Sequence, residues 1–297
     1  MIDLHTHSTH SDGFLTPSEL LEDAIKIGLK ALALTDHDAV SGLQELHTAA
    51  QGKNITVVNG AELSVYYPHT DMEIIAMDIP DSSLDAFAIY QREEMVRRDK
   101  LARYRIELLQ KAGYDITYEE VAYNSKHELR TQIRRPHFVD VLLRKGYIKN
   151  VDEAYQNIFA YGGVCYVSNN PWPAQEMIKF IRDNGAKAIL AHPIHTKHEG
   201  QDLYNLVNEL KQAGLNGIEV FHSSHDKTHR KAYLNLIKEL RLVTGGGSDY
   251  HGGTAHPEND LGTGHDKNLN IPYLVLEQLK SGTAPKVSYY RELEKYL

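Results

Sequence analysis

Short apolar runs alternate with amphipathic stretches along most of the chain. Apolar runs at residues 1–4 and 31–34 predict strands, and Thr16, Pro17 and Glu19 between them predict a helix start with an N-cap and a capping box. Further short runs predict strands at residues 56–58, 74–77, 188–190, 218–221, 242–244 and 287–289. About seven or eight such units, most of them separated by helical stretches, favour a closed, barrel-like parallel sheet.

The pattern changes between residues 81 and 161. Residues 84–112 form a long charged stretch that predicts one helix, which Gly113 is suited to end. Residues 135–145 and 151–161 predict further helices, and no buried strand is evident among them. We therefore predict a barrel domain from residues 1–80 and 162–297, with a helical insertion at residues 81–161 that covers the active site. The basic run from Arg92 to Arg105 is interpreted as the solvated face of the long helix.

Composition narrows the class of protein. The 297 residues carry a formal net charge of −8, so no basic surface for long nucleic acids is expected. The single cysteine, Cys165, excludes an internal disulfide and favours a reducing compartment. No apolar run approaches the ~20 residues of a membrane span, and no secretory signal is evident at the start. We expect a cytoplasmic protein that does not contact membranes, and the sequence indicates no oligomeric state.

Histidines and carboxylates gather directly after the predicted strands. In parallel α/β barrels the carboxyl ends of the strands form the rim on which active sites are built. His5 and His7 are two residues apart, so on a strand both rings leave the same face and can hold one ion. Imidazole combined with carboxylate suits Zn, Mn or Fe. The candidate metal ligands are His5, His7, Asp12, His37, Glu62, His192, Asp249 and His251.

Each short motif is weak when it is taken alone. A His-x-His pair occurs among ordinary histidines, Asp36 to Asp38 could be a capped turn, and Gly245 to Gly247 favours a tight turn over a phosphate-binding loop. Trp172 is interpreted as packing under a loop. The joint pattern is much stronger than its parts and predicts a metal site. The histidines interpreted as solvated are His10, His47, His198, His229, His256 and His265.

These motifs resemble the polymerase and histidinol phosphatase (PHP) family of metal-dependent phosphoesterases, most closely its stand-alone branch that dephosphorylates nucleotides or short RNA. The resemblance implies an α/β fold, a distorted (β/α)7 barrel, and two to three divalent ions of Mn, Fe or Zn. The matching segments, in chain order, are D-L-H-T-H-S (3–8), S-D-G (11–13), T-D-H-D (35–38), G-A-E (60–62), R-P-H (135–137), A-H-P (191–193), G-I-E-V (217–220) and G-S-D-Y-H-G (247–252).

The resemblance also implies which residues hold each ion. The implied sets are His5, His7, Glu62 and Asp249 for the first ion, Glu62 and His192 for the second, and Asp12, His37 and His251 for the third. Arg135 and His137 match positions that contact the substrate phosphate. Glu73 stands where many relatives have a histidine ligand. It is either a ligand of the second ion or, if its strand begins at Ile74, a solvated residue.

The expected activity is hydrolysis of a small phosphate ester, most simply a nucleoside 3′,5′-bisphosphate or short oligonucleotide, by a hydroxide that the metals activate and Glu62 helps to hold. His222, if protonated, could assist the leaving oxygen. Alternative substrates are a cyclic phosphodiester, a sugar phosphate or histidinol phosphate. An amidohydrolase is disfavoured because no lysine follows a predicted strand in a bridging position. A non-catalytic, metal-stabilised nucleotide-binding module is the alternative outside the enzymes.

Overall fold

The computed structural model describes residues 1–68, 70–123, 129–130, 132–160, 162–167, 171–253 and 259–297. Its centre is a curled six-stranded sheet in the order β1-β2-β3-β4-β5-β6. The strands are β1 Ala31–Leu34, β2 Thr56–Tyr67, β3 Thr70–Met77, β4 Lys187–Leu190, β5 Gly217–His222 and β6 Val243–Gly247. A small antiparallel pair, β7 Asn259–Asp260 and β8 Gly264–His265, lies outside this sheet.

The sheet is mixed, so the prediction of an all-parallel barrel is wrong in one region. Strands β2 and β3 form an antiparallel hairpin with Tyr67 opposite Thr70, and β3 is also antiparallel to β4. The other pairs, β1–β2, β4–β5 and β5–β6, are parallel. The two strands of this hairpin are longer than the apolar runs predicted at residues 56–58 and 74–77. As a result, Glu62 lies within β2 and Glu73 lies within β3.

The first residues of the chain lie between the two edge strands of the sheet. Asp3 N–H donates to Ala31 O (3.0 Å) on β1, while Leu4 N–H donates to Gly246 O (3.2 Å) on β6. A Cβ at Gly247 would come within 2.3 Å of His5, so glycine permits this close approach. Gly245 to Gly247 therefore belong to a buried strand, and the tight turn predicted for them is wrong.

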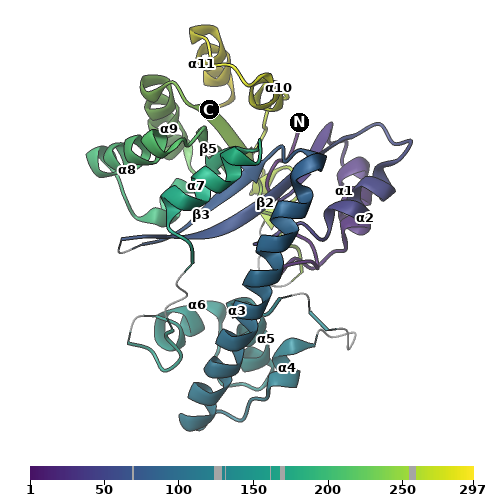
Figure 1. Cartoon of the computed structure of the whole chain (residues 1–297), viewed down its shortest axis with the longest axis vertical. Coiled ribbons are helices and arrows are strands. Elements are labelled where there is room, and N and C mark those ends of the chain that lie inside the picture. Colours follow the sequence, from purple (N-terminus) through teal and green to yellow (C-terminus); the bar gives the residue numbers. More distant parts are fainter. Residues whose placement is uncertain (69, 124–128, 131, 161, 168–170, 254–258) are drawn as a thin grey trace.

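Helices surround the sheet (Figure 1). The first begins as predicted, since Thr16 accepts from Glu19 N–H and Glu19 completes the capping box. The strand predicted at residues 287–289 is wrong: α11 forms there because Tyr289, Tyr290 and Leu293 bury one helical face. These helices are α1 Pro17–Lys26, α2 Leu43–Ala50, α7 Ala174–Asp183, α8 Gly200–Ala213, α9 Lys227–Leu240, α10 Leu274–Ser281 and α11 Val287–Leu293, with 3-10 turns η1 Asp81–Ser83, η3 Pro193–Thr196 and η4 Glu294–Tyr296.

A second group of helices has a hydrophobic core of its own, below the sheet in Figure 1. The long helix α3 joins the two parts, because its Phe87 packs in the main core and its Leu109 packs in the second. Among the described helices, none has the length and apolarity that crossing a bilayer requires. The group comprises α3 Leu84–Lys111, α4 Tyr118–Ala122, α5 Arg135–Arg144, α6 Val151–Glu153 and the π turn η2 Ala154–Ile158.

Candidate metal centre

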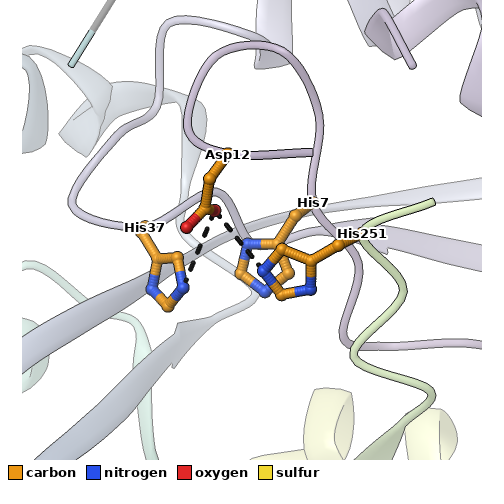
Figure 2. Close-up of side chains that lie close together, drawn as sticks. All are labelled: His7, Asp12, His37 and His251. Carbon is orange, nitrogen blue, oxygen red and sulfur yellow. Dashed lines mark ion pairs between the residues drawn. The ribbon is translucent and has the colours of Figure 1, made fainter. Parts of the chain in front are cut away.

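The candidate ligands from the amino-terminal segment, from β2 and from the ends of the other strands converge on one site. In two overlapping groups, the possible ligand atoms all lie within 4.8 Å of one another; the first is His7, Asp12, His37 and His251, and the second is His5, His7, Glu62 and Asp249. Figure 2 shows the first group, in which Asp12 Oδ1 lies 3.4 Å from His251 Nε2 and 3.8 Å from His37 Nε2.

The carboxylate of Glu62 lies at the centre of the site. Its Oε2 is 2.9 Å from His37 Nδ1, 3.3 Å from His5 Nε2 and 3.4 Å from His7 Nε2. Its Oε1 is 2.8 Å from His192 Nε2. The two oxygens therefore contact four histidines that come from three separate segments of the chain.

Glu73 lies beside Glu62 at the same site. Its partner in the register is Ser64, two residues along β2 from Glu62, so both glutamates leave the same face of the hairpin. Glu73 Oε1 lies 3.3 Å from His37 Nδ1, and Oε2 lies 3.5 Å from His192 Nε2. The alternative in which β3 begins at Ile74 and leaves Glu73 outside the strand is wrong.

The buried donor atoms fit a divalent cation. An unsatisfied buried polar group costs ~1–3 kcal/mol, so several at one place indicate a missing partner. Carboxylate oxygens and imidazole nitrogens together match the ligand preference of Mn, Fe or Zn. Among the candidate ligands, the buried atoms that have no hydrogen-bond partner are His5 Nε2, His7 Nδ1 and Nε2, Asp12 Oδ1, His37 Nδ1 and Glu62 Oε2.

The electrostatics of the site favour positive charge. Burial opposes protonation of His251, but Asp249 and Asp12 outweigh it and raise its pKa to about 10. Burial likewise opposes protonation of His192, and Glu62 raises its pKa to about 9. Burial opposes ionisation of Glu62, but attraction to His5 and His37, with the hydrogen bond of His192, holds its pKa well below the usual value. Asp12, Glu62 and Asp249, whose pKa values are all lowered, thus remain charged and stabilise a cation placed among them. Burial, and then Glu62, raise the pKa of Glu73.

His5 is oriented by a carboxylate behind it. Its Nδ1 lies 3.1 Å from Glu219 Oε1, and the other oxygen of Glu219 accepts from the backbone N–H of His192 (2.8 Å). A proton on Nδ1 leaves the lone pair of Nε2 directed at Glu62 and Asp249. This carboxylate–histidine arrangement is the usual support of a metal-binding imidazole.

Two further carboxylates shape the loops that carry ligands. Asp36 accepts from the backbone and hydroxyl of Ser8 (2.7 and 2.6 Å) and from the hydroxyl of Ser11 (2.6 Å), which holds the loop leading to Asp12. Asp3 accepts from Ser248 N–H (2.9 Å), next to Asp249. Asp36 and Asp3 are therefore structural supports of the site.

Residues at the site adopt backbone angles that most side chains avoid. Asp38 has φ 50°, Asp249 has φ 56° and His192 has φ 22°. Such conformations cost of order 1–3 kcal/mol each and persist where the surroundings enforce them, which is common at functional sites. At Asp249 and His192, these conformations occur in the turns that follow β6 and β4, where both residues lie in the site around Glu62.

Comparison with known proteins identifies the family. The PHP domain family model matches residues 3–243 of the chain. The chain belongs to the PHP family. A phosphoribosyl 1,2-cyclic phosphate 1,2-diphosphodiesterase from Eggerthella lenta is 31% identical over 254 residues, 84% of this chain and 94% of that protein. A 3′,5′-nucleoside bisphosphate phosphatase from Chromobacterium violaceum is 30% identical, over 90% of this chain and 92% of that protein.

Solved structures agree with this assignment. A structure described as an amidohydrolase from Chromobacterium violaceum, with bound sulfate and no metal, is 27% identical and has a TM-score of 0.82, covering 97% of this chain and 99% of that one. A protein from Bifidobacterium adolescentis described as a metal-dependent phosphoesterase is 25% identical, with a TM-score of 0.76 and coverage of 96% and 97%. This PHP chain is a phosphoesterase.

Two arginines beside the PHP centre were missed in the sequence. Asp38 forms ion pairs with Arg98 of α3 and Arg134 just before α5. Against burial, His37 and His251 lower the pKa of Asp12, and Arg134 adds to their effect. The interpretation of residues 92–105 as a solvated face is therefore wrong for Arg98 and Arg105, which are buried. Arg134 directly precedes the R-P-H motif, which was the available signal for it.

The predicted substrate residues of the PHP site differ in their surroundings. Arg135 is exposed and lines a cavity of about 90 Å³ together with Glu73, His192 and His195. His137 is buried, and its Nδ1 accepts from Arg134 N–H (3.0 Å), so it caps the start of α5. Burial, and then Arg130, lower the pKa of His137 to about 3, so it is neutral at physiological pH.

Two more histidines border the site. His222 is buried, its Nδ1 accepts from Ser224 N–H (3.1 Å), and its Nε2 lies 3.5 Å from Asp249 Oδ2. His195, which sequence reasoning did not single out, lies on η3 with its ring 4.8 Å from that of His192. Burial and the neighbouring His192 lower the pKa of His195 to about 4. Its spacing of three from His192 in the A-H-P motif was the signal.

Proposed function

We propose that this PHP protein holds two to three divalent ions and hydrolyses a phosphate ester of nucleotide type, a 3′,5′-bisphosphate or a short oligonucleotide. The observation that carries the proposal is the central position of Glu62, whose oxygens lie within 3.4 Å of nitrogens from four histidines. A carboxylate shared in this way is suited to bridge two ions. Mn, Fe and Zn all match the ligand chemistry.

The proposed ligand sets overlap. Glu73 belongs to the second because it faces both His37 and His192 across the hairpin, and a carboxylate there shifts preference from Zn towards Mn. His7 contributes to the first set and stands at the edge of the third. The sets are His5, His7, Glu62 and Asp249; then Glu62, Glu73 and His192; then Asp12, His37 and His251.

When bound, such ions lower the pKa of water towards ~7 and neutralise charge on phosphate oxygens. The chain supplies the remaining chemistry. Arg135, with Arg134 behind it, offers guanidinium donors to phosphate oxygens at the cavity beside His192. We place His137 at the rim of that phosphate site, where its capping bond positions Arg134.

His222 is proposed to assist the leaving oxygen by donating a hydrogen bond from Nε2. Because its Nδ1 accepts from Ser224 N–H, the neutral ring carries its proton on Nε2, the atom that faces Asp249. This tautomer makes His222 a donor rather than a ligand. Loss of that donor is expected to slow turnover of poor leaving groups more than that of good ones.

The nucleotide class of substrate is favoured by the relatives. One is named for nucleoside bisphosphates, and another, from Haemophilus influenzae, is a 5′-3′ exoribonuclease 28% identical over 84% of this chain and 89% of its own. The relative from Eggerthella lenta is named for a cyclic phosphate. A cyclic phosphodiester is accordingly the second candidate.

Two features of architecture are proposed with the function. Residues 1–6 act as the seventh strand of a (β/α)7 barrel, supported by their hydrogen bonds to β1 and β6. Residues 81–161 act as an insertion over the site, supported by their separate core and by the contacts of Arg98 and Arg134 with Asp38.

The test is a substrate panel with controlled metal. Chelator-treated protein is assayed with p-nitrophenyl phosphate, adenosine 3′,5′-bisphosphate, a short 5′-phosphorylated RNA, a cyclic phosphodiester and a sugar phosphate, each with and without Mn²⁺. We expect turnover only with metal, and the highest kcat/KM for a nucleotide. Full activity without metal contradicts the metal centre, and a preference for the sugar or cyclic phosphate contradicts the substrate class.

A further inference from the structure

A second cavity lies at the opposite ends of the strands from the metal centre. It has a volume of about 450 Å³, and its wall includes Lys187 at the start of β4, Asn216 directly before β5 and Leu242 directly before β6. His192 and Asp249 follow the other ends of β4 and β6. These strands have 4 to 6 residues, so a length of roughly 13–20 Å separates the two places. The helix α10, which forms part of the wall, lies at the end of the molecule away from the helical insertion (Figure 1).

The charged side chains that line this cavity are all cations. They are Arg182, Lys187, Lys211 and Arg241, and no carboxylate is among the described lining residues. None of the four forms an ion pair or a side-chain hydrogen bond with another described residue. The chain as a whole has 40 acidic residues and 32 basic ones, so its composition does not account for a cavity of one positive sign.

The ends of four helices meet at the cavity and reduce its positive charge only in part. Arg182 stands in the last turn of α7, Lys211 in the last turn of α8, and Arg241 is the C-cap of α9. Gly282, the C-cap of α10, also lines the cavity. Each helix end carries a partial charge of roughly −0.5, so together they offset about half of the charge of the four side chains. The remainder of about +2 matches an anion with two or more negative charges.

Part of the cavity wall is arranged before any ligand binds. Gly214 follows α8 with φ 113°, and a Cβ at this position would lie 2.5 Å from Arg182 Nη1. The glycine therefore lets the guanidinium lie directly against the backbone. Asn216 Oδ1 accepts from Ala188 N–H (2.9 Å), which leaves the NH₂ group of Asn216 as a further donor at the wall. Groups that are already placed lose less conformational freedom on binding.

We propose that this cavity is a second ligand site, separate from the metal centre, which binds the diphosphate group of a small molecule. Arg182 and Arg241 offer paired guanidinium donors to phosphate oxygens, and the two lysines add positive charge. The volume lies in the range of cavities that hold a whole small molecule, and the apolar side chains of Leu242 and Leu279 lie beside the cations. A nucleoside diphosphate fits this combination, and inorganic pyrophosphate shares the group that is recognised.

The test is calorimetric titration of the chelator-treated whole chain with inorganic pyrophosphate and with ADP. The double variant Arg182→Gln/Lys211→Gln removes two cations from the cavity. The control Lys100→Gln/Lys231→Gln removes the same charge from exposed positions of α3 and α9 outside the cavity. The wild type and the control should bind one equivalent of diphosphate that the cavity variant binds about ten-fold more weakly or worse.

The comparison among the three proteins isolates the cavity. Diphosphate that binds beside the metal ligands is common to all three, so only the difference between the cavity variant and the control is informative. Equal affinity and stoichiometry in all three proteins overturn the proposal. Tighter binding of ADP identifies a nucleoside diphosphate as the ligand, and tighter binding of pyrophosphate identifies the inorganic ion.

Thermal unfolding tests the alternative that these cations only stabilise the helix ends. A cation in the last turn of a helix is stabilising even without a ligand. If that were their whole role, the cavity variant would have a lower Tm than the control, and pyrophosphate would shift the Tm of all three proteins equally. That pair of results overturns the site. We expect pyrophosphate to raise the Tm of the wild type and of the control more than that of the cavity variant.

Discussion

Glu219 offers a sharp test of how the metal centre is held together. Glu219 is not one of the proposed metal ligands, but its carboxylate accepts from His5 Nδ1 (3.1 Å) and from the backbone N–H of His192 (2.8 Å). Glu219→Gln keeps the size of the side chain and removes the charge. The amide oxygen of the glutamine can still accept from His5 Nδ1. The amide NH₂ group then faces the backbone N–H of His192, and two donors cannot form a hydrogen bond with each other.

The expected loss follows from these two contacts. A hydrogen bond to a charged group is worth ~1.5–3 kcal/mol and one between neutral groups about 1, so the weakened His5 contact alone costs roughly 0.5–2 kcal/mol. The unsatisfied N–H of His192 adds to this. Carboxylates that support metal-binding histidines typically contribute 10–100-fold in metal affinity, and we expect a loss of ~10–100-fold in Mn²⁺ affinity here.

The assay is competition for Mn²⁺ against a chromophoric chelator, followed by kcat at increasing Mn²⁺. Because Glu219 acts through His5, excess metal should restore most of kcat, whereas loss of a direct ligand would not be restored. Glu239→Gln is the control, since it makes the same change at an exposed position of α9. Metal affinity within two-fold of the wild type would refute the orienting role.

Three other changes test separate parts of the structure. Glu62→Ala should lower kcat by at least ~10³ and reduce metal content, because both of its oxygens serve the site; a variant with normal metal and turnover contradicts the bridging role. Glu73→Ala should lose one equivalent of metal, and Glu73→His should retain it with a shift towards Zn; full metal and rate in Glu73→Ala would show that Glu73 is no ligand. The thiol of Cys165, with its pKa near 11, should react slowly with iodoacetamide at pH 8, faster as pH rises, and fastest in denaturant; rapid labelling of the native protein would contradict its burial.

The ligand cluster could be predicted because its signal is local. A histidine or carboxylate directly after an apolar run is visible in the sequence, and parallel strands bring such ends to one rim. The hairpin of β2 and β3 was not visible, because the connection from Tyr67 to Thr70 contains no Asn-Gly or Asp-Gly pair. The predicted start of β3 is therefore wrong, and only the register of the hairpin shows that Glu73 lies within the strand, on the same face as Glu62.

The pairing of Asp38 with Arg98 and Arg134 could not be identified from the sequence. Arg98 is one of many charged residues on a long helix, and its partner Asp38 lies 60 residues away in the chain. Arg134 is 96 residues from the same aspartate. Nothing in a run of alternating charges marks which one faces inward, since that depends on how the helix packs against the barrel. The six-histidine set interpreted as solvated includes His47, which instead contacts Asn59 Oδ1 (2.6 Å), and His256, which lies outside the described residues.

The seating of residues 1–6 between β1 and β6 has a consequence for biosynthesis. Asp3 and Ser248 contact each other across 245 positions of the chain. The first segment can pair with β1 early, but nearly the whole barrel must be translated before β6, its second neighbour, exists. At a translation rate of ~5–20 residues per second, about ten seconds or more pass between the synthesis of His5 and His7 and the completion of the site around them. We therefore expect ion loading to follow translation, and a nascent chain stalled before β6 should fail to retain Mn²⁺ although most of the other proposed ligands are already made.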